Sequence, residues 1–294
     1  MYLGVNGKGI KCSLGFSTAV YTYDNRGNRI SECYFDIEGK PTCSREGYYK
    51  IQRTYDDEWN LVSTQQWRLV PGMNLKEEKT LDSHSRAISV KYYSLDETPV
   101  INSSGYHEKR NSYDSTNGHL LSESYYDTLG QSICCKDGYH EIQCQYDGQG
   151  REISYTYYGM NCAPILNASG YFEKRFTYFD NGRLQVVSYF GIDGEPVAVS
   201  WGYYQVRIFL NDEGRTTELQ YLGEQESLLQ LGPNITNICR VSYRSDLNQT
   251  TYQNFNRSPD GTEAYLYGFC YTYDENGNEL SKISVDEYGN PIPK

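Results

Sequence analysis

Tyr146-Asp-Gly-Gln-Gly150-Arg-Glu-Ile-Ser-Tyr-Thr-Tyr-Tyr158, with the later segment Gly170-Tyr-Phe-Glu-Lys-Arg-Phe-Thr-Tyr178, contains one complete unit of a repeating pattern. Asp147 opens an Asp-x-x-Gly turn, in which an aspartate accepts hydrogen bonds from turn amides and a glycine tolerates a positive φ. Aromatic residues dominate the flanking segments, which is typical of β-strands. The pattern predicts two antiparallel strands joined by a type I turn with a following bulge, and it predicts a strand over residues 170–178.

The pattern recurs about every 32 residues along the chain. A tyrosine begins the turn motif at Tyr23, Tyr55, Tyr113, Tyr146, Tyr178 and Tyr273. A Gly-Tyr pair begins at Gly47, Gly105, Gly138, Gly170 and Gly202, with successive gaps of 58, 33, 32 and 32 residues. Self-similarity at this period marks an array in which each unit buries its apolar face against its neighbours.

We therefore predict an all-β fold, an elongated solenoid-like array of antiparallel β-hairpin repeats with two strands and two turns in each unit. A single array of about nine units would span residues 1–294, with residues 223–262 degenerate. In that degenerate region Ser227-Leu-Leu-Gln-Leu fits either a short helix or a degraded strand. The second unit lacks its Gly-Tyr pair, and the stretch Trp67–Glu78 reads as shortened.

The composition fits a thin β-sheet with a large solvent-exposed surface. Tyrosine accounts for 31 of 294 residues, against 9 Phe and 3 Trp, and its apolar body with a polar tip suits a half-exposed sheet. The net charge of −11 opposes binding to nucleic acid or anionic lipid, which both depend on Lys and Arg. Direct membrane insertion is not expected either, because no stretch approaches the roughly 18 apolar residues of a membrane span.

The cysteines and the N-terminus bear on the compartment. Nine cysteines are scattered without a C-x-x-C pair, so we expect small buried side chains rather than a disulfide framework or a zinc site. The first residues lack a secretory signal and resemble the tail of a repeat, which favours a fragment or a recent truncation. The protein would be cytoplasmic if this chain is complete, and at the cell surface or secreted if it belongs to a larger exported chain.

Two segments carry a family resemblance. Tyr21-Thr-Tyr-Asp-Asn-Arg-Gly-Asn28 and Tyr271-Thr-Tyr-Asp-Glu-Asn-Gly-Asn278 resemble the Tyr-Asp (YD) repeat of bacterial Rhs-type proteins. Through its Gly-aromatic spacing the chain is more distantly similar to cell-wall-binding hairpin repeats. The likeness covers nearly the whole chain and implies a β-hairpin architecture; in Rhs proteins such repeats wind into a large β shell that encloses a toxin.

Motifs for catalysis are missing from the sequence. It contains no nucleophile elbow, P-loop, H-E-x-x-H or EF-hand loop. His107 and His140 share a repeat position that we align with Lys50, Phe172 and Tyr204, so we interpret it as an exposed strand position rather than a catalytic or metal-binding one. The acidic turn residues are explained by hydrogen bonds to turn amides. We expect no enzyme activity, catalytic residue, metal or cofactor.

An aromatic doublet in the returning strand supplies the candidate ligand contacts. Its first members are Tyr34, Tyr92, Tyr125, Tyr157 and Tyr189, and its second members are Phe35, Tyr93, Tyr126, Tyr158 and Phe190. Adjacent strand residues point to opposite faces. Because the second position accepts Phe, we expect it to pack inward, and we expect the first to direct its hydroxyl to water, backbone or ligand.

These observations support two kinds of function. A row of the first-member tyrosines would bind a glycan or cell-wall polymer, as the contact surface of a non-catalytic module in a bacterial surface or envelope-associated protein. The alternative is a cross-strand ladder that only stabilises the sheet, with each pair contributing roughly 0.2–1 kcal/mol. The chain would then be a structural spacer or scaffold, or a protein-interaction repeat of a larger multidomain protein, with or without an appended enzyme domain.

Overall fold

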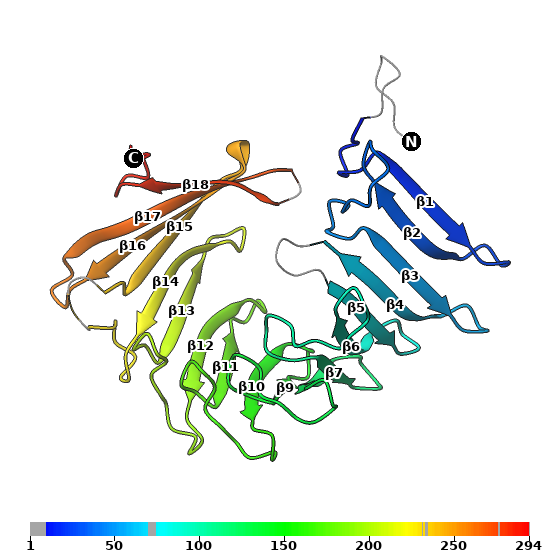
Figure 1. Cartoon of the computed structure of the whole chain (residues 1–294). Coiled ribbons are helices and arrows are strands. Elements are labelled where there is room, and N and C mark those ends of the chain that lie inside the picture. Colours follow the sequence, from blue (N-terminus) through cyan, green and yellow to red (C-terminus); the bar gives the residue numbers. More distant parts are fainter. Residues whose placement is uncertain (1–9, 70–74, 231, 233–234, 276, 294) are drawn as a thin grey trace. The chain divides into compact units, whose positions relative to one another are not determined.

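The computed structural model describes residues 10–69, 75–230, 232, 235–275 and 277–293 (Figure 1). Its described elements are strands and one 3-10 helix, η1 (Ser245–Leu247). The first nine strands are β1 (Thr18–Tyr23), β2 (Arg29–Phe35), β3 (Lys50–Tyr55), β4 (Leu61–Arg68), β5 (Leu75–Leu81), β6 (Ala87–Tyr93), β7 (Glu108–Tyr113), β8 (Leu120–Tyr126) and β9 (Glu141–Tyr146). The others are β10 (Glu152–Tyr158), β11 (Glu173–Tyr178), β12 (Leu184–Phe190), β13 (Gln205–Leu210), β14 (Thr216–Leu222), β15 (Ile238–Arg244), β16 (Gln249–Arg257), β17 (Glu263–Tyr273) and β18 (Glu279–Val285).

The chain forms two compact units, residues 1–143 with 158–163 and residues 144–157 with 164–294. In the first unit, each strand from β1 to β8 pairs antiparallel with the next one along the chain. In the second unit, β10 to β18 pair in the same way. Figure 1 shows the successive hairpins side by side within each unit. The prediction of an all-β array of antiparallel hairpins is confirmed.

The hairpin turn has the predicted chemistry. In the turn between β1 and β2, the Asp24 carboxylate accepts hydrogen bonds from the backbone N–H groups of Arg26 and Asn28, at 2.9 and 2.8 Å. Gly27 adopts a φ of 89°, and the strand register shifts between Thr22 and Tyr23. A short polar side chain and a glycine thus close the type I turn and bulge from local sequence alone.

Each full repeat contains three turns, so the prediction of two was wrong. After the returning strand, the chain makes a second turn and then a third, and the Gly-Tyr pair lies in the third. Asn102 begins one such third turn, in which Gly105 N–H donates to the Asn102 carbonyl at 3.0 Å with a φ of 93°. The strand predicted over residues 170–178 correspondingly begins only at Glu173, because the Gly170-Tyr171 pair closes the turn before it.

The third turns stack on one another and form a second layer. In the first unit, Lys136 N–H donates to the Ser104 carbonyl at 2.9 Å. In the second unit, Ser200 N–H donates to the Ser169 carbonyl at 3.0 Å. Val199, from a third turn, is buried with Val187 and Tyr189 of β12. The core of the array therefore lies between one face of the sheet and the stacked turns.

The two irregular regions, residues 223–262 and the stretch Trp67–Glu78, keep some of the backbone pairing of the regular repeat. Residues 227–228 contain no helix; instead Leu228 forms an isolated antiparallel bridge with Leu222 of β14. Farther along, Asn237 N–H donates to the Phe255 carbonyl at 3.1 Å, as in the regular repeats. In the shortened stretch, β4 pairs directly with β5 in a register from Ser63↔Thr80 to Arg68↔Leu75; residues 70–74 of that stretch lie outside the described residues.

We predict that Gly105→Ala destabilises the chain more than Gly130→Ala does. Both glycines have positive φ, so alanine at either costs about 1–2 kcal/mol of backbone strain. Only at Gly105 would the added Cβ also lie 3.1 Å from a backbone nitrogen, that of Lys136 in the next turn; at Gly130 it would meet nothing within 4 Å. Urea denaturation of the two variants measures the difference, and equal losses would contradict the stacking of the turns.

Candidate functional site

The structure reverses the expected orientation of the aromatic doublet. The first members Tyr34, Tyr125, Tyr157 and Tyr189 are buried, and Tyr92 is half-buried; the second members are all half-buried. The first member faces the layer of turns, which covers it. The second faces the opposite side of the sheet, where a guanidinium lies over the ring in two repeats: Arg110 over Tyr126 and Arg175 over Phe190, each at 3.8 Å.

The buried tyrosines do not form a row on their own, because tyrosines of the Gly-Tyr pairs lie between them. In the first unit, the centroid of the Tyr106 ring lies 6.0 Å from that of Tyr92 and 4.6 Å from that of Tyr125. In the second unit, successive ring centroids are 4.8 to 5.9 Å apart along a column listed in order as Tyr157, Tyr171, Tyr189, Tyr203 and Tyr221. We call this set the second-unit tyrosine column.

The interleaving was missed at the sequence level, although a signal was present. In five repeats a tyrosine directly follows the glycine of the third turn. The strand predicted over residues 170–178 includes Tyr171, however, so the Gly-Tyr pair gives no reason to expect contact between the two tyrosine sets. The contact arises because the third turn folds back over the sheet and brings its tyrosine between two rings of neighbouring strands.

Two of the buried tyrosines, Tyr34 and Tyr125, donate their hydroxyl groups to carboxylates of the same chain. Tyr34 Oη donates to Glu32 at 2.7 Å, and Glu32 also pairs with Arg53 at 2.6 Å. Tyr125 Oη donates to Glu123, which pairs with Lys109 at 2.7 Å. These contacts bring the predicted binding residues into the core of the ladder. Their role in glycan binding stays a prediction.

The shared position of His107 and His140 is buried, so its interpretation as an exposed strand position was wrong. The two side chains are 6% and 5% exposed, and each ring Nδ1 lies 3.2 Å from a backbone carbonyl, of Val100 and Ile133 respectively. The backbone bonds also place Tyr49, not Lys50, at the equivalent position: Tyr49 N–H donates to the next strand as His107 N–H does. The turn layer reaches this position, which removes it from water.

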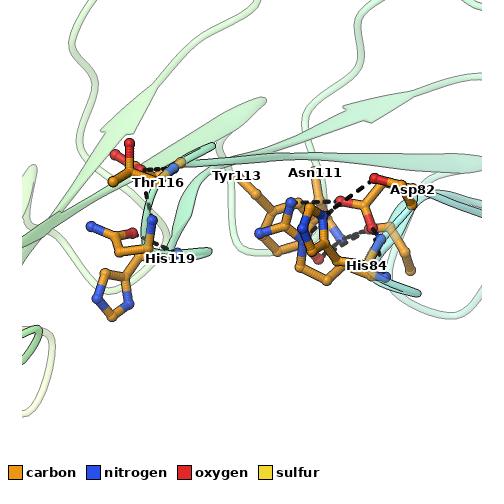
Figure 2. Close-up of polar contacts among 11 residues, drawn as sticks. Asp82, His84, Asn111, Tyr113, Thr116 and His119 are labelled. Carbon is orange, nitrogen blue, oxygen red and sulfur yellow. Dashed lines mark hydrogen bonds and ion pairs between the residues drawn. The ribbon is translucent and has the colours of Figure 1, made fainter.

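The turn carboxylates are engaged by turn groups, as Figure 2 shows for the turns that begin at Asp82 and Asp114. Asp82 accepts hydrogen bonds from the backbone N–H of His84 at 2.9 Å and from Arg86 Nε at 2.7 Å. The hydrogen bond from the Arg86 side chain, assisted by the turn amides, lowers the pKa of Asp82 to about 2. This chemistry supports the interpretation of the acidic residues as turn formers.

Two further observations cover the whole described chain. Its residues include no group of three or more His, Cys, Asp or Glu side chains arranged to hold a metal ion, and the nine cysteines, all among the described residues, form no disulfide. None of the helical segments that the structure describes is long and apolar enough to cross a membrane.

A pocket opens in the second unit at the end of its tyrosine column. The cavity measures about 410 Å³ and is lined by Trp201, Tyr203, Tyr221, Leu229, Ile235, Thr236, Asn254 and Tyr267. Trp201 is 78% exposed and Tyr267 is 49% exposed, so both rings face solvent, in contrast to the rings inside the column. None of the described residues that line the pocket carries a formal charge. Burial raises the pKa of Tyr221 to about 12.

Comparison with known proteins adds little. No protein-family model matches the chain, and no curated protein matches it at a significant level. Among solved structures, the chain is similar to one in the crystal structure of TcdB2-TccC3-TEV, with a TM-score of 0.28 and 13% sequence identity; the match covers 93% of this chain and 18% of that one. At this TM-score the match carries no argument about function. The likeness to YD repeats rests on the tyrosine-rich antiparallel hairpins themselves.

Substitutions at Tyr125 test whether its ring stabilises the fold or serves only as a ligand contact. We predict that Tyr125→Ala lowers the free energy of unfolding by about 3–5 kcal/mol, because the ring is 4% exposed and packs between two others. Tyr125→Phe should cost only about 1 kcal/mol, since Glu123 keeps its ion pair with Lys109. Urea denaturation gives both values; a Tyr125→Ala variant as stable as the parent would show that the stacked tyrosine rings of the first unit are not structural.

The buried and half-buried tyrosines of both units also predict a loss of stability in alkali. Burial, first among the causes, raises the pKa of Tyr92, Tyr125, Tyr139, Tyr189, Tyr203 and Tyr221 above the ordinary 10.0. The unfolded chain therefore loses these protons first, so the stabilisation is complete below pH 10 and declines as the pH rises further. We expect part of the tyrosinate absorbance to appear only together with loss of the β-sheet circular dichroism. Complete titration of all tyrosines before any change in circular dichroism would contradict this expectation.

Proposed function

We propose that this chain is a non-catalytic repeat module that binds a glycan or cell-wall polymer, within a larger bacterial surface or envelope-associated protein. The array supplies a scaffold, and exposed aromatic rings supply the contact. The proposal keeps the ligand class expected from the sequence but moves the contact away from Tyr34, Tyr92, Tyr125, Tyr157 and Tyr189, because Tyr92 is half-buried and the other four are buried.

One observation carries the proposal, which is the uncharged pocket with Trp201 and Tyr267 at its solvent side. Its volume of about 410 Å³ lies within the roughly 300–1,000 Å³ of pockets that hold small ligands. Such pockets are mostly apolar and aromatic, with a few polar groups that orient the ligand. Asn254 and Thr236 are groups of that kind. A sugar ring combines apolar C–H faces with hydroxyls and matches both features.

The alternative function is a structural spacer, and the buried tyrosine columns favour it. A ladder whose hydroxyls bind the chain's own carboxylates needs no ligand. The two functions differ in what they require of the exposed rings. A spacer does not require the exposed ring of Trp201, whereas a glycan-binding module depends on it.

The test is a glycan and cell-wall polysaccharide binding screen on the purified chain, with Trp201→Ala as the loss variant. We expect saturable binding that falls about tenfold or more in the variant, because loss of an aromatic anchor at a binding site costs above roughly 1–2 kcal/mol. Trp59→Ala is the matched control: Trp59 is also exposed, at 57%, but lies in the β3–β4 turn of the first unit. Absence of binding by the folded parent chain would reject the proposal and favour the spacer.

A further inference from the structure

The backbone hydrogen bonds show which residues replace the column tyrosines beyond Tyr221. In the regular repeat, Tyr189 N–H donates to the Tyr204 carbonyl at 3.1 Å, and Tyr204 N–H donates to the Leu222 carbonyl at 2.8 Å. The residue before Tyr204 is Tyr203, and the residue before Leu222 is Tyr221. Both are members of the second-unit tyrosine column.

The same two bonds recur one repeat later. Tyr221 N–H donates to the Asn237 carbonyl at 2.9 Å, and Asn237 N–H donates to the Phe255 carbonyl at 3.1 Å. Thr236 and Asn254 precede Asn237 and Phe255, so they occupy the next two column positions. Neither has an aromatic ring, and both line the pocket. The cavity is therefore the space that two tyrosine rings fill in the regular repeat.

A third departure from the repeat lies at the same place. Trp201 precedes Gly202 in its third turn, and none of the corresponding residues in five other described third turns is aromatic: Leu14, Glu46, Ser104, Asp137 and Ser169. A single exposed apolar side chain is ordinary in a soluble protein. Here, however, the added ring lines the same cavity from which two rings are missing. Three independent changes that converge on one cavity point to a ligand rather than to loss of packing.

We propose that this pocket binds one neutral pyranose residue, which takes the vacated place in the column next to Tyr221. This inference rests on the proposed function and assigns its ligand class and site. A ring of this size replaces a tyrosine ring against Tyr221, with Trp201 and Tyr267 covering its solvent side. The Asn254 amide and the Thr236 hydroxyl offer hydrogen bonds to sugar hydroxyls. An ionised sugar is disfavoured, because its charge would meet no opposite charge in the lining.

The decisive variant restores the missing ring. Thr236→Tyr in the full chain should fill the pocket, weaken binding of methyl glycosides of neutral hexoses and N-acetylhexosamines by more than tenfold, and raise the melting temperature through a new ring contact with Tyr221. Asn254→Tyr fills the same space from the neighbouring strand and tests the idea a second time. Thr116→Tyr, on an exposed turn of the first unit, is the matched control and should change neither quantity. Calorimetry measures the binding of each glycoside, and p-cresol serves as an aromatic probe of similar ring size.

Each outcome decides the proposal. Glycoside binding that both ring-restoring variants lose, while they stay folded, supports it. Glycan binding that survives in both variants overturns the pocket but leaves the proposed function standing. Binding of p-cresol without any glycoside overturns the sugar assignment and points to an aromatic side chain of a protein partner. Binding of neither probe overturns both the pocket and its ligand class, and so does unfolding of both variants, because a ring would then not fit the space.

Discussion

Contact between tyrosine rings from the sheet and tyrosine rings from the turns holds each unit together. A hairpin array has only a thin apolar layer, so each repeat needs a side chain that is large enough to bridge two layers and polar enough to end near water. Tyrosine meets both needs, and aromatic pairs at these ring separations add about 0.5–1.5 kcal/mol beyond their buried area. Because Tyr106, Tyr171 and Tyr203 from the turns each lie between two rings from strands, neighbouring repeats stabilise one another, as expected of a repeat array.

This arrangement explains the tyrosine content. Tyr34 and Tyr125 are buried, yet each hydroxyl finds a carboxylate, Glu32 or Glu123, that is itself paired with a cation. A phenylalanine at either position would remove one hydrogen bond from a carboxylate that is partly shielded from water, and this loss lowers the stability of the fold. At Tyr34 and Tyr125 the hydroxyl of the first doublet member therefore has a structural role. The ring that tolerates Phe lies on the opposite face, where Arg110 and Arg175 pack against it.

The regular stacking of the tyrosine rings also shows where the column is interrupted. A missing ring in a stacked array leaves a cavity of defined shape, and such a cavity lowers stability unless something fills it. At the end of the second-unit tyrosine column the chain carries Thr236 and Asn254 at ring positions and adds Trp201 beside them. This combination connects the scaffold to the proposed binding function, because the same stacking that builds the core prepares one place for a ring from outside.

Local chemistry made the hairpins, their Asp-x-x-Gly turns and the period of about 32 residues predictable from the sequence, since each turn is closed by residues within five positions of one another. The sequence could not show the third turn folding over the sheet, the burial of His107 and His140, or the face that each doublet tyrosine takes. Those features depend on contacts between neighbouring repeats, such as Lys136 N–H with the Ser104 carbonyl, which join residues of separate turns. The pocket belongs to this second group, because Trp201, Thr236, Asn254 and Tyr267 lie far apart in the chain and meet only when the repeats stack.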